Sequence, residues 1–255
     1  MTYHLSGLKT LVTAGIKTSN GLLAALLAPA CAACGALLDE PLSGCVCRMC
    51  WQSIRPMTPP LCDRCGVPLA RLNARCSSCT DESAVSRARA IGEYAGTLRE
   101  VIHALKYAGR RSLAPQLAAR MRARGHELIS RADVVVPVPL HWRRQYHRGF
   151  NQAREIARHL GPPVVMALAR RRATRPQVEL AADRRRANVT GAFVLRHGRH
   201  LEIRGRTVLL VDDVSTTGAT LEACARALKE SGASEVHALT AARVVARWRQ
   251  PADDR

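Results

Sequence analysis

The distribution of apolar and polar positions divides the chain into three regions. Residues 1–30 are apolar with few charges, and residues 31–82 are rich in Cys, Pro and Gly with little periodicity. From about Ala88 onward, compact apolar runs alternate with amphipathic stretches. The third region therefore predicts alternating strands and helices, whereas the second predicts loops that a metal could hold in place.

Within the regular region, the apolar runs predict strands at residues 89–94, 134–136, 207–211 and within 235–245, and residues 164–166 form another apolar run. The amphipathic stretches predict a helix from an N-cap at Thr97 to a stop at Gly109, and further helices at residues 113–121, 151–160 and 221–228. Unbroken apolar strands separated by helices predict an α/β fold whose parallel sheet is covered on both faces.

The first 30 residues allow two interpretations. Lys9 and Lys17 precede an apolar run at residues 22–27 and then Ala-Pro-Ala, which superficially resembles a signal peptide. The same leucines also suit an amphipathic helix that leads into the Cys-rich region, and the run is too short to span a bilayer. Export would place nine clustered thiols in an oxidising space, so we expect a cytoplasmic protein without a membrane span.

Length and composition limit the classes of function. The 255 residues provide room for one to two domains, and 47% hydrophobic but only 4% aromatic residues predict a core of Ala, Leu and Val. The formal net charge is +19, and 35 of the 39 basic residues are Arg because the chain has four Lys. Such a charge favours polyanionic partners, namely nucleic acid, phosphorylated metabolites or pyrophosphate, although arginines outside specific motifs can simply be solvated.

Ten cysteines are present, and nine of them lie between Cys31 and Cys79. Eight form four CxxC pairs with gaps of 12, 11 and 10 residues between the pairs, namely Cys31, Cys34, Cys47, Cys50, Cys62, Cys65, Cys76 and Cys79. Each CxxC turn directs two thiolates at one centre, so four turns predict two structural four-cysteine Zn²⁺ sites. Gly35 and Gly66 follow the second Cys of their pairs, where a tight turn favours glycine.

The spacing leaves the pairing of the CxxC turns open between sequential and interleaved arrangements. Cys45 is surplus and could substitute for Cys47. A disulfide-stapled domain is the alternative for the whole region, and redox CxxC chemistry lacks the strand and helix that would frame it.

Residues 208–220 (VLLVDDVSTTGAT) carry the strongest catalytic or binding signal outside the cysteines. An apolar strand runs into Asp212 and Asp213, and a turn of small and hydroxylated residues precedes a helix. Backbone N–H groups at a helix N-terminus bind anions, and adjacent carboxylates at a strand end can accept hydrogen bonds from vicinal hydroxyls. Two rival phosphate motifs are excluded, because a Walker loop requires Lys and the dinucleotide fingerprint requires three spaced glycines.

This stretch resembles the phosphoribosyl-diphosphate (PRPP) motif of type I phosphoribosyltransferases. Further segments resemble the ComF family, whose members join a Cys-rich N-terminal module to such a domain: residues 102–107 (IHALKY), 136–140 (VPVPL), 148–153 (RGFNQA) and 188–193 (NVTGAF). The resemblance covers nearly all of residues 31–245. It implies a leader or helix at residues 1–30, a double zinc ribbon at 31–82, a phosphoribosyltransferase domain with a parallel sheet at 88–246, and a tail at 247–255.

The resemblance also implies roles for individual residues. Asp212 and Asp213 would bind the ribose hydroxyls of PRPP, and its 5′-phosphate would lie on Ser215, Thr216, Thr217, Gly218, Ala219 and Thr220. A pyrophosphate loop would comprise Val138, Pro139 and Leu140, with Mg²⁺ bridging pyrophosphate and ribose oxygens. Thr216 stands where purine-salvage members carry an acid, which argues against purine salvage and leaves catalysis open.

Two Arg-rich segments complete the picture. Residues 169–188 match the mobile loop that closes over PRPP in the related enzymes. The other segment mixes Arg with aromatic residues, a composition that suits single-stranded nucleic acid: Trp142, Arg143, Arg144 and Arg148. Each could instead be a solvated charged face.

Two functions therefore remain. The first is a PRPP-binding phosphoribosyltransferase-like protein linked to DNA uptake during natural competence, which, if active, transfers phosphoribose to an unidentified nucleophile with release of pyrophosphate. The second is a non-catalytic factor that binds single-stranded DNA and uses the loop as a PRPP or phosphate sensor. The resemblance implies competence proteins, such as a DNA-uptake helicase, as partners of either.

Overall fold

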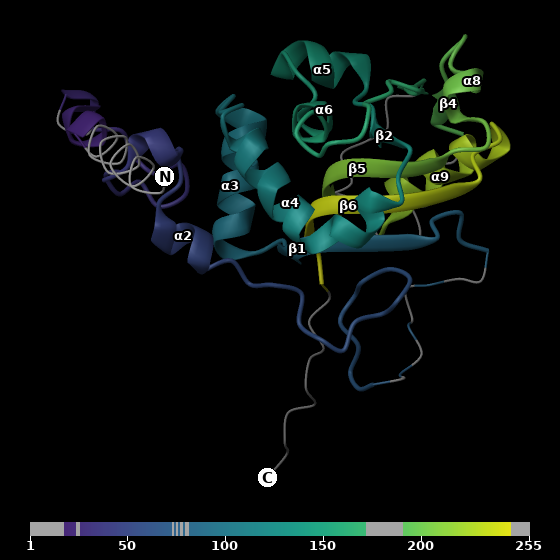
Figure 1. The fold of residues 1–255 in the computed structure, drawn as a ribbon, viewed down its shortest axis with the longest axis horizontal. Helices are drawn as coiled ribbons and strands as arrows, with labels where there is room; N and C mark the ends of the chain where they lie inside the picture. Colours follow the sequence, from purple (N-terminus) through teal and green to yellow (C-terminus); the bar gives the residue numbers. More distant parts are fainter. Residues whose placement is uncertain are drawn as a thin grey trace, which may run out of the picture.

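The computed structural model describes residues 18–23, 26–72, 74, 76, 79, 82–171 and 191–245. Its centre is a four-stranded sheet in the order β1-β6-β5-β2, formed by Arg87–Glu93 (β1), Val134–Pro137 (β2), Thr207–Ser215 (β5) and Glu235–Arg243 (β6). All three pairs of neighbouring strands are parallel (Figure 1). The predicted parallel sheet is thus confirmed, and the carboxyl ends of its strands lie along one edge.

Apolar side chains cover both faces of this sheet. On one face Leu209 and Leu239 join the apolar residues of helices Gly96–Tyr107 (α3), Leu113–Ser130 (α4) and Gln152–Ala157 (α6). On the other face Val208 and Leu210 pack with Leu221 and Leu228 of Ala219–Glu230 (α9). Since strands buried on both sides need apolar residues at successive positions, the unbroken Val and Leu runs of the sequence follow from this layering.

The helices differ from the predicted ones mainly at their ends. The buried face of α3 contains Val101, Ile102 and Leu105 as predicted, but the N-cap is Ala95 and Thr97 lies inside the helix. The Thr97 hydroxyl instead makes a 2.6 Å hydrogen bond with the Ser53 hydroxyl, so contact with the Cys-rich region displaces its capping role. Helix α4 continues past residue 121 to Ser130 across a kink at Gly125, and Leu128 beyond the kink is buried.

The remaining elements are short. Trp142–Arg148 is a helix (α5) that the pattern did not predict, and α6 ends at Ala157, earlier than the predicted residue 160. Leu168–Arg170 (β3) and Phe193–Leu195 (β4) form a two-stranded antiparallel sheet, followed by the helical turn His200–Ile203 (α8). In the apolar run at residues 164–166, Val164 makes a single parallel bridge with Val135. Residues 172–190, the main part of the predicted lid, lie outside the described residues.

The Cys-rich region contains little regular structure, as predicted. A 3₁₀ turn at Pro41–Ser43 (η1) and a short helix at Arg48–Gln52 (α2) are its named elements. Residues 18–23 and 26–27 are helical, and Asn20 Oδ1 accepts a hydrogen bond from the Leu42 N–H. In Figure 1 the part with α2 lies beside α3, whereas the later part of the region lies below β1.

Strand β5 is longer than the sequence pattern predicted. It does not end before the two carboxylates but continues through Asp212 and Asp213 to Ser215, and Asp212 is in register with Thr240 of β6. The central strand therefore extends past its apolar run, because β6 provides a partner along this whole length.

Among the described residues, no helix combines the length and the apolar character that a membrane crossing requires.

Candidate functional site

The two aspartates of β5 lie in different environments at the carboxyl edge of the sheet. The Asp213 side chain is 5% exposed, and its Oδ2 lies 2.8 Å from Lys106 Nζ of α3. Asp212 is half-buried, and its Oδ1 accepts a hydrogen bond of 2.9 Å from the Asp213 backbone N–H. Burial and the neighbouring Asp213 carboxylate raise the pKa of Asp212 well above its usual range, because one Lys cannot compensate two close carboxylates.

Lys106 is the residue that sequence reasoning missed. It lies within the quoted IHALKY segment, but the pattern gave no reason to assign it a role. Burial alone would lower the pKa of Lys106, yet the Asp213 carboxylate outweighs burial and raises that pKa above its ordinary value. The composition contained a signal, because Lys is rare in this chain, with four Lys against 35 Arg. One of these few lysines, Lys106, lies next to the apolar face of a predicted helix.

The turn after β5 has the geometry of an anion-binding loop. Gly218 adopts a left-handed conformation with φ of 82° and caps α9, which begins at Ala219. The Thr217 hydroxyl accepts a 3.4 Å hydrogen bond from the Ala219 N–H, and residues 216–220 are half-buried. A side chain at position 218 would strain this backbone, so glycine is required where the strand turns into the helix.

The predicted pyrophosphate loop begins beside β5 at the level of Val211. Strand β2 pairs with β5, and the Val138 N–H donates a 2.9 Å hydrogen bond to the Val211 carbonyl, one residue before Asp212. The Asn151 side chain caps α6 and also donates to the Val138 carbonyl at 2.9 Å. The predicted loops at residues 138–140 and 216–220 thus follow neighbouring strands, and the first of them begins one residue before the level of Asp212.

Helix α5 brings the Arg and aromatic side chains to the same edge. Trp142 is 64% and Tyr146 83% exposed, and the Arg143 guanidinium lies 5.2 Å from the Trp142 ring centroid. A cavity of about 280 Å³ joins this helix to α3 and is lined by Lys106, Tyr107, Gly109, Arg144, His147 and Arg148. Since Lys106 contacts Asp213 at the same time, the cavity connects the basic helix to the aspartates.

The cysteines form two separate clusters with sequential pairing. The sulfur atoms of Cys31, Cys34, Cys47 and Cys50 lie within 4.8 Å of one another, as do those of Cys62, Cys65, Cys76 and Cys79. We call these clusters the first and the second zinc centre. Sulfur separations of 3.9 Å for Cys34–Cys47 and 3.6 Å for Cys65–Cys76 match the about 3.8 Å edge of a tetrahedron with Zn–S bonds of about 2.3 Å.

Backbone donors lower the pKa of one thiol in each centre, whereas burial and the neighbouring thiols raise the pKa of Cys50 and Cys79. Burial would raise the pKa of Cys31, but backbone hydrogen bonds from Cys47 and Cys34 outweigh it and lower the pKa to about 6. For Cys62 the backbone groups of Cys65 and Arg64 likewise outweigh burial and lower the pKa to about 7. Gly35 and Gly66 have φ of 74° and 68°, as the predicted tight turns require. Cys45 belongs to neither centre, and its Sγ lies 3.4 Å from the Ser112 hydroxyl.

Comparison with known proteins agrees with both parts of this geometry. The family described as "Phosphoribosyl transferase domain" matches residues 146–254, and the "Double zinc ribbon domain" matches residues 22–80. The two clusters are therefore structural zinc centres of a double zinc ribbon. The solved structure "structure of the allosteric regulatory enzyme of purine biosynthesis" aligns with 51% of this chain and 25% of its own chain at 24% identity, with a TM-score of 0.34.

Curated relatives match over most of their own length. "DNA utilization protein YhgH" of Escherichia coli K12 is 32% identical over 202 residues, which are 75% of this chain and 87% of that protein. "Competence protein F" of Haemophilus influenzae is 33% identical over 75% of this chain and 87% of its own. "Competence protein ComFC" of Bacillus subtilis is 26% identical over 73% and 79% of the two chains. With this identity and coverage added to the zinc ribbon and the transferase domain, the chain belongs to the ComF family.

Proposed function

We propose that the protein binds PRPP at the carboxyl edge of its sheet. One observation carries this proposal: residues 138–140 and 216–220 follow the adjacent strands β2 and β5, and β5 carries Asp212, Asp213 and Ser215 at its carboxyl end. Open α/β sheets bind ligands at this edge, where loops from neighbouring strands converge.

The geometry supports a role for each part of PRPP. Asp212 and Asp213 accept hydrogen bonds from the ribose hydroxyls, with Asp212 the more accessible of the two. The 5′-phosphate lies on Ser215 and the turn at residues 216–220, where the N-terminus of α9 provides backbone N–H donors and a favourable dipole. The pyrophosphate lies against the turn of Val138, Pro139 and Leu140, where Leu140 provides the backbone N–H, because the Val138 N–H is bonded to Val211 and proline has none.

Mg²⁺ enters the proposal with the substrate. The donors at this edge are carboxylate and hydroxyl oxygens, which suit a hard cation that is bound largely through phosphate oxygens. Burial and the Asp213 carboxylate both raise the pKa of Asp212, and a divalent cation beside the ribose would relieve the repulsion between the two carboxylates. The cavity around Lys106, Arg144 and Arg148 adds positive charge for pyrophosphate.

We propose that this binding serves DNA utilisation in the cytoplasm. Relatives are named "DNA utilization protein" and "competence protein", and eight cysteines must stay reduced to hold zinc. Partners in such a process would be single-stranded DNA and a DNA-uptake helicase. A transfer reaction would move phosphoribose to a nucleophile and release pyrophosphate, but Thr216 provides no acid for a purine base.

The test is a calorimetric titration of the full chain with PRPP and Mg²⁺. Saturable binding is expected, and an Asp212→Ala/Asp213→Ala variant should lose it. Absence of binding to the unmodified, zinc-loaded chain would overturn the proposal. Binding without acceleration of PRPP hydrolysis would identify a sensor, whereas release of pyrophosphate would identify an enzyme.

Single-stranded nucleic acid is the second candidate ligand, favoured by the exposed rings of Trp142 and Tyr146 beside Arg143. Aromatic side chains stack on bases, and arginines contact phosphates, so the affinity should fall steeply with salt. An Arg143→Ala/Arg144→Ala variant should bind a fluorescent oligothymidine more weakly and with a shallower salt slope. The matched control is Arg204→Ala/Arg206→Ala, which removes the same charge from exposed positions before β5, at the opposite edge of the sheet. Equal losses in both variants would indicate only a general charge effect.

A further inference from the structure

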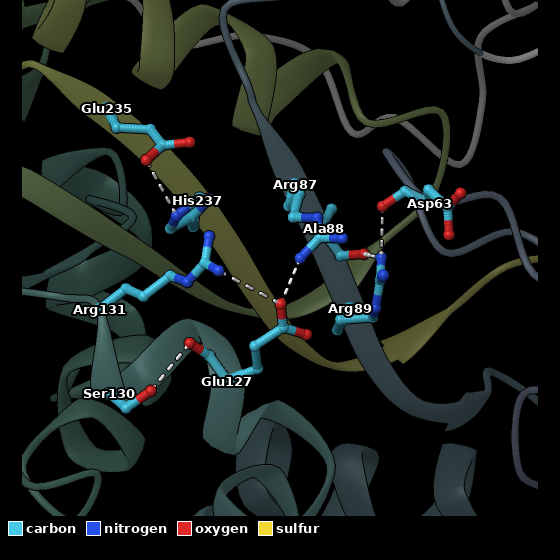
Figure 2. Close-up of polar contacts among 9 residues, drawn as sticks. All are labelled: Asp63, Arg87, Ala88, Arg89, Glu127, Ser130, Arg131, Glu235 and His237. Carbon is cyan, nitrogen blue, oxygen red and sulfur yellow. Dashed lines mark hydrogen bonds and ion pairs between the residues drawn. The ribbon is translucent and has the colours of Figure 1, made fainter.

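The first CxxC turn of the second zinc centre is fixed to the sheet through three successive carbonyl groups. The Asp63 carbonyl accepts a 2.9 Å hydrogen bond from Arg89 Nη1, and the Arg64 carbonyl accepts one of 2.6 Å from the Ala88 N–H. Figure 2 shows the Arg89 contact reaching from β1 to Asp63. The approach is close, because a Cβ at Gly66 would lie 2.7 Å from the Ala88 carbonyl oxygen.

The third of these carbonyls connects the zinc centre to the strand beside the phosphate loop. Arg243 is 7% exposed, and its Nη1 donates a 3.0 Å hydrogen bond to the Cys65 carbonyl. Arg243 ends β6 and is in register with Ser215, whose carbonyl accepts a 2.9 Å hydrogen bond from the Val244 N–H. Ser215 is the residue immediately before the loop at 216–220.

The other CxxC turn leads to the far side of the same loop. Ser83 follows Cys79 by four positions, and its hydroxyl donates to Glu222 Oε2 at 2.8 Å. The Ala84 N–H donates to Glu222 Oε1, also at 2.8 Å. Glu222 lies in the first turn of α9, and its own N–H donates to the Gly218 carbonyl at 2.9 Å. Ser83 and Ala84 are thus held by the helix that the loop begins.

A cavity of about 190 Å³ lies between the second zinc centre and the loop. Its walls include Cys65 and Cys79 of the ligand turns, Thr217 and Gly218 of the loop, and the two residues that connect them, Glu222 and Arg243. Zinc would connect Cys65, which is bonded to Arg243, with Cys79, which precedes the residues bonded to Glu222. Both sides of the loop would then be linked through the metal.

The first zinc centre has different contacts. Cys31 and Cys50 belong to the apolar cluster that contains Leu117 and Met121 of α4. The Arg120 guanidinium lies 3.5 Å from the ring centroid of Trp51, close to the ligand Cys50. This centre therefore packs against the helical layer, and it provides an internal control for the second centre.

We propose that the second zinc centre clamps the phosphate loop, so that zinc held by Cys62, Cys65, Cys76 and Cys79 tightens phosphate binding at residues 215–220. This inference rests on the proposed PRPP site. By thermodynamic linkage, bound PRPP must in turn tighten the retention of this zinc by the same factor.

The primary test compares one cysteine variant from each centre in the full chain. Cys79→Ser removes a ligand of the second centre and Cys34→Ser one of the first, and each preparation is checked for the zinc that remains. The PRPP dissociation constant should rise by about tenfold in Cys79→Ser, within the usual range of coupling, and by at most about twofold in Cys34→Ser. Equal weakening in both variants, or none in Cys79→Ser, would overturn the proposal.

A variant that keeps both zinc centres covers the case in which Cys79→Ser fails to fold. Glu222→Ala removes the acceptor of the Ser83 and Ala84 hydrogen bonds. Electrostatics alone would make this variant bind PRPP more tightly, since a carboxylate near the loop repels phosphate. The clamp predicts weaker binding and faster zinc release to a chelator, and tighter binding would contradict it.

Hydrogen exchange separates failure of the clamp from failure of the PRPP proposal. Amide exchange in peptides covering residues 211–221 should be faster in Cys79→Ser than in Cys34→Ser, with no ligand added. If the unmodified chain bound no PRPP, this measurement would still decide whether the second centre orders the loop. Identical exchange in both variants would refute the clamp.

Discussion

Lys106 Nζ lies 2.8 Å from Asp213 Oδ2, and the two side chains are 15% and 5% exposed. The pair joins α3 to β5 at the carboxyl edge of the sheet, beside the half-buried Asp212. Removal of one partner from a buried ion pair leaves an uncompensated charge, which costs far more than removal of both. Variants of this ion pair therefore measure how much the buried charges at the site change the free energy of unfolding.

We expect Lys106→Met to lower the free energy of unfolding by about 3–5 kcal/mol, because the Asp213 carboxylate then remains buried without its partner. The double variant Lys106→Met/Asp213→Leu should recover much of this loss. Urea denaturation followed by circular dichroism measures both. A double variant as unstable as Lys106→Met would contradict a charge-based explanation.

The second prediction concerns Asp212, where we expect a gain in folding stability to be accompanied by a loss of PRPP affinity. The pKa of this carboxyl is raised in the folded chain, so its ionisation lowers the free energy of unfolding. This loss of stability is absent below the unfolded pKa of about 3.9 and grows as the pH rises through the folded pKa. Asp212→Asn should therefore gain about 0.5–2 kcal/mol near pH 7.5, in the range typical of relieved functional sites, while losing PRPP affinity.

Thermal unfolding without Mg²⁺, recorded from pH 4.5 to 8, checks this expectation. The advantage of Asp212→Asn over the unmodified chain should shrink toward acid pH. An advantage that is constant across this range would show that its cause is not the ionisation of Asp212.

The third prediction tests the assignment of the cysteines. The two centres predict two Zn²⁺ per chain by plasma emission spectroscopy. Cys45→Ser should keep both ions, because Cys45 contacts Ser112 and lies outside the clusters, whereas Cys47→Ser should lose one. If the first centre were unaffected by Cys47→Ser but lost its zinc in Cys45→Ser, the two cysteines would have exchanged roles.

The fourth prediction concerns His237, which is buried in the central strand β6. Its Nε2 lies 3.5 Å from Glu235 Oε2, and Figure 2 shows the charged groups nearby, namely Arg87, Glu127, Arg131 and Glu235. Burial lowers the pKa of His237, with Glu235 opposing this shift and Arg131 adding to it.

A His with a lowered folded-state pKa binds fewer protons in the folded chain. Its stability contribution is complete above the unfolded pKa of about 6.5 and is lost as the pH falls toward the folded pKa. His237→Leu should therefore lose less stability than the unmodified chain between pH 7 and 5. His126→Gln, at an exposed position of α4, is the control. Parallel stability profiles for His237→Leu and the unmodified chain would refute this account.

Local sequence signals were sufficient to predict the sheet, the two zinc centres and the position of the loops. The Val and Leu runs predicted the parallel strands, and each CxxC turn carries its own geometry within four residues. Only two residues separate Asp213 from the turn at residues 216–220 in the sequence. Such features depend on short-range chemistry, which a sequence displays directly.

Contacts between distant segments were not predictable in the same way. Lys106 meets Asp213 across 107 positions, and Arg243 meets Cys65 across 178. Helix α5 was missed because its residues are charged and aromatic and none of them is buried, so no apolar periodicity marks it. The order of the CxxC turns likewise depended on packing, since spacing alone allowed interleaved pairing.

The packing of the first zinc centre limits how the chain can be divided. Cys31, Leu38 and Val46 share one apolar cluster with Leu98 and Leu113, although the former lie in the Cys-rich region, which ends at residue 82, and the latter lie beyond it. A transferase fragment that begins at residue 83 would expose the apolar surface that these residues cover. The first part of the zinc ribbon therefore contributes to the hydrophobic core of the transferase domain. The change in composition near residue 82 is not a boundary between two independently folding domains.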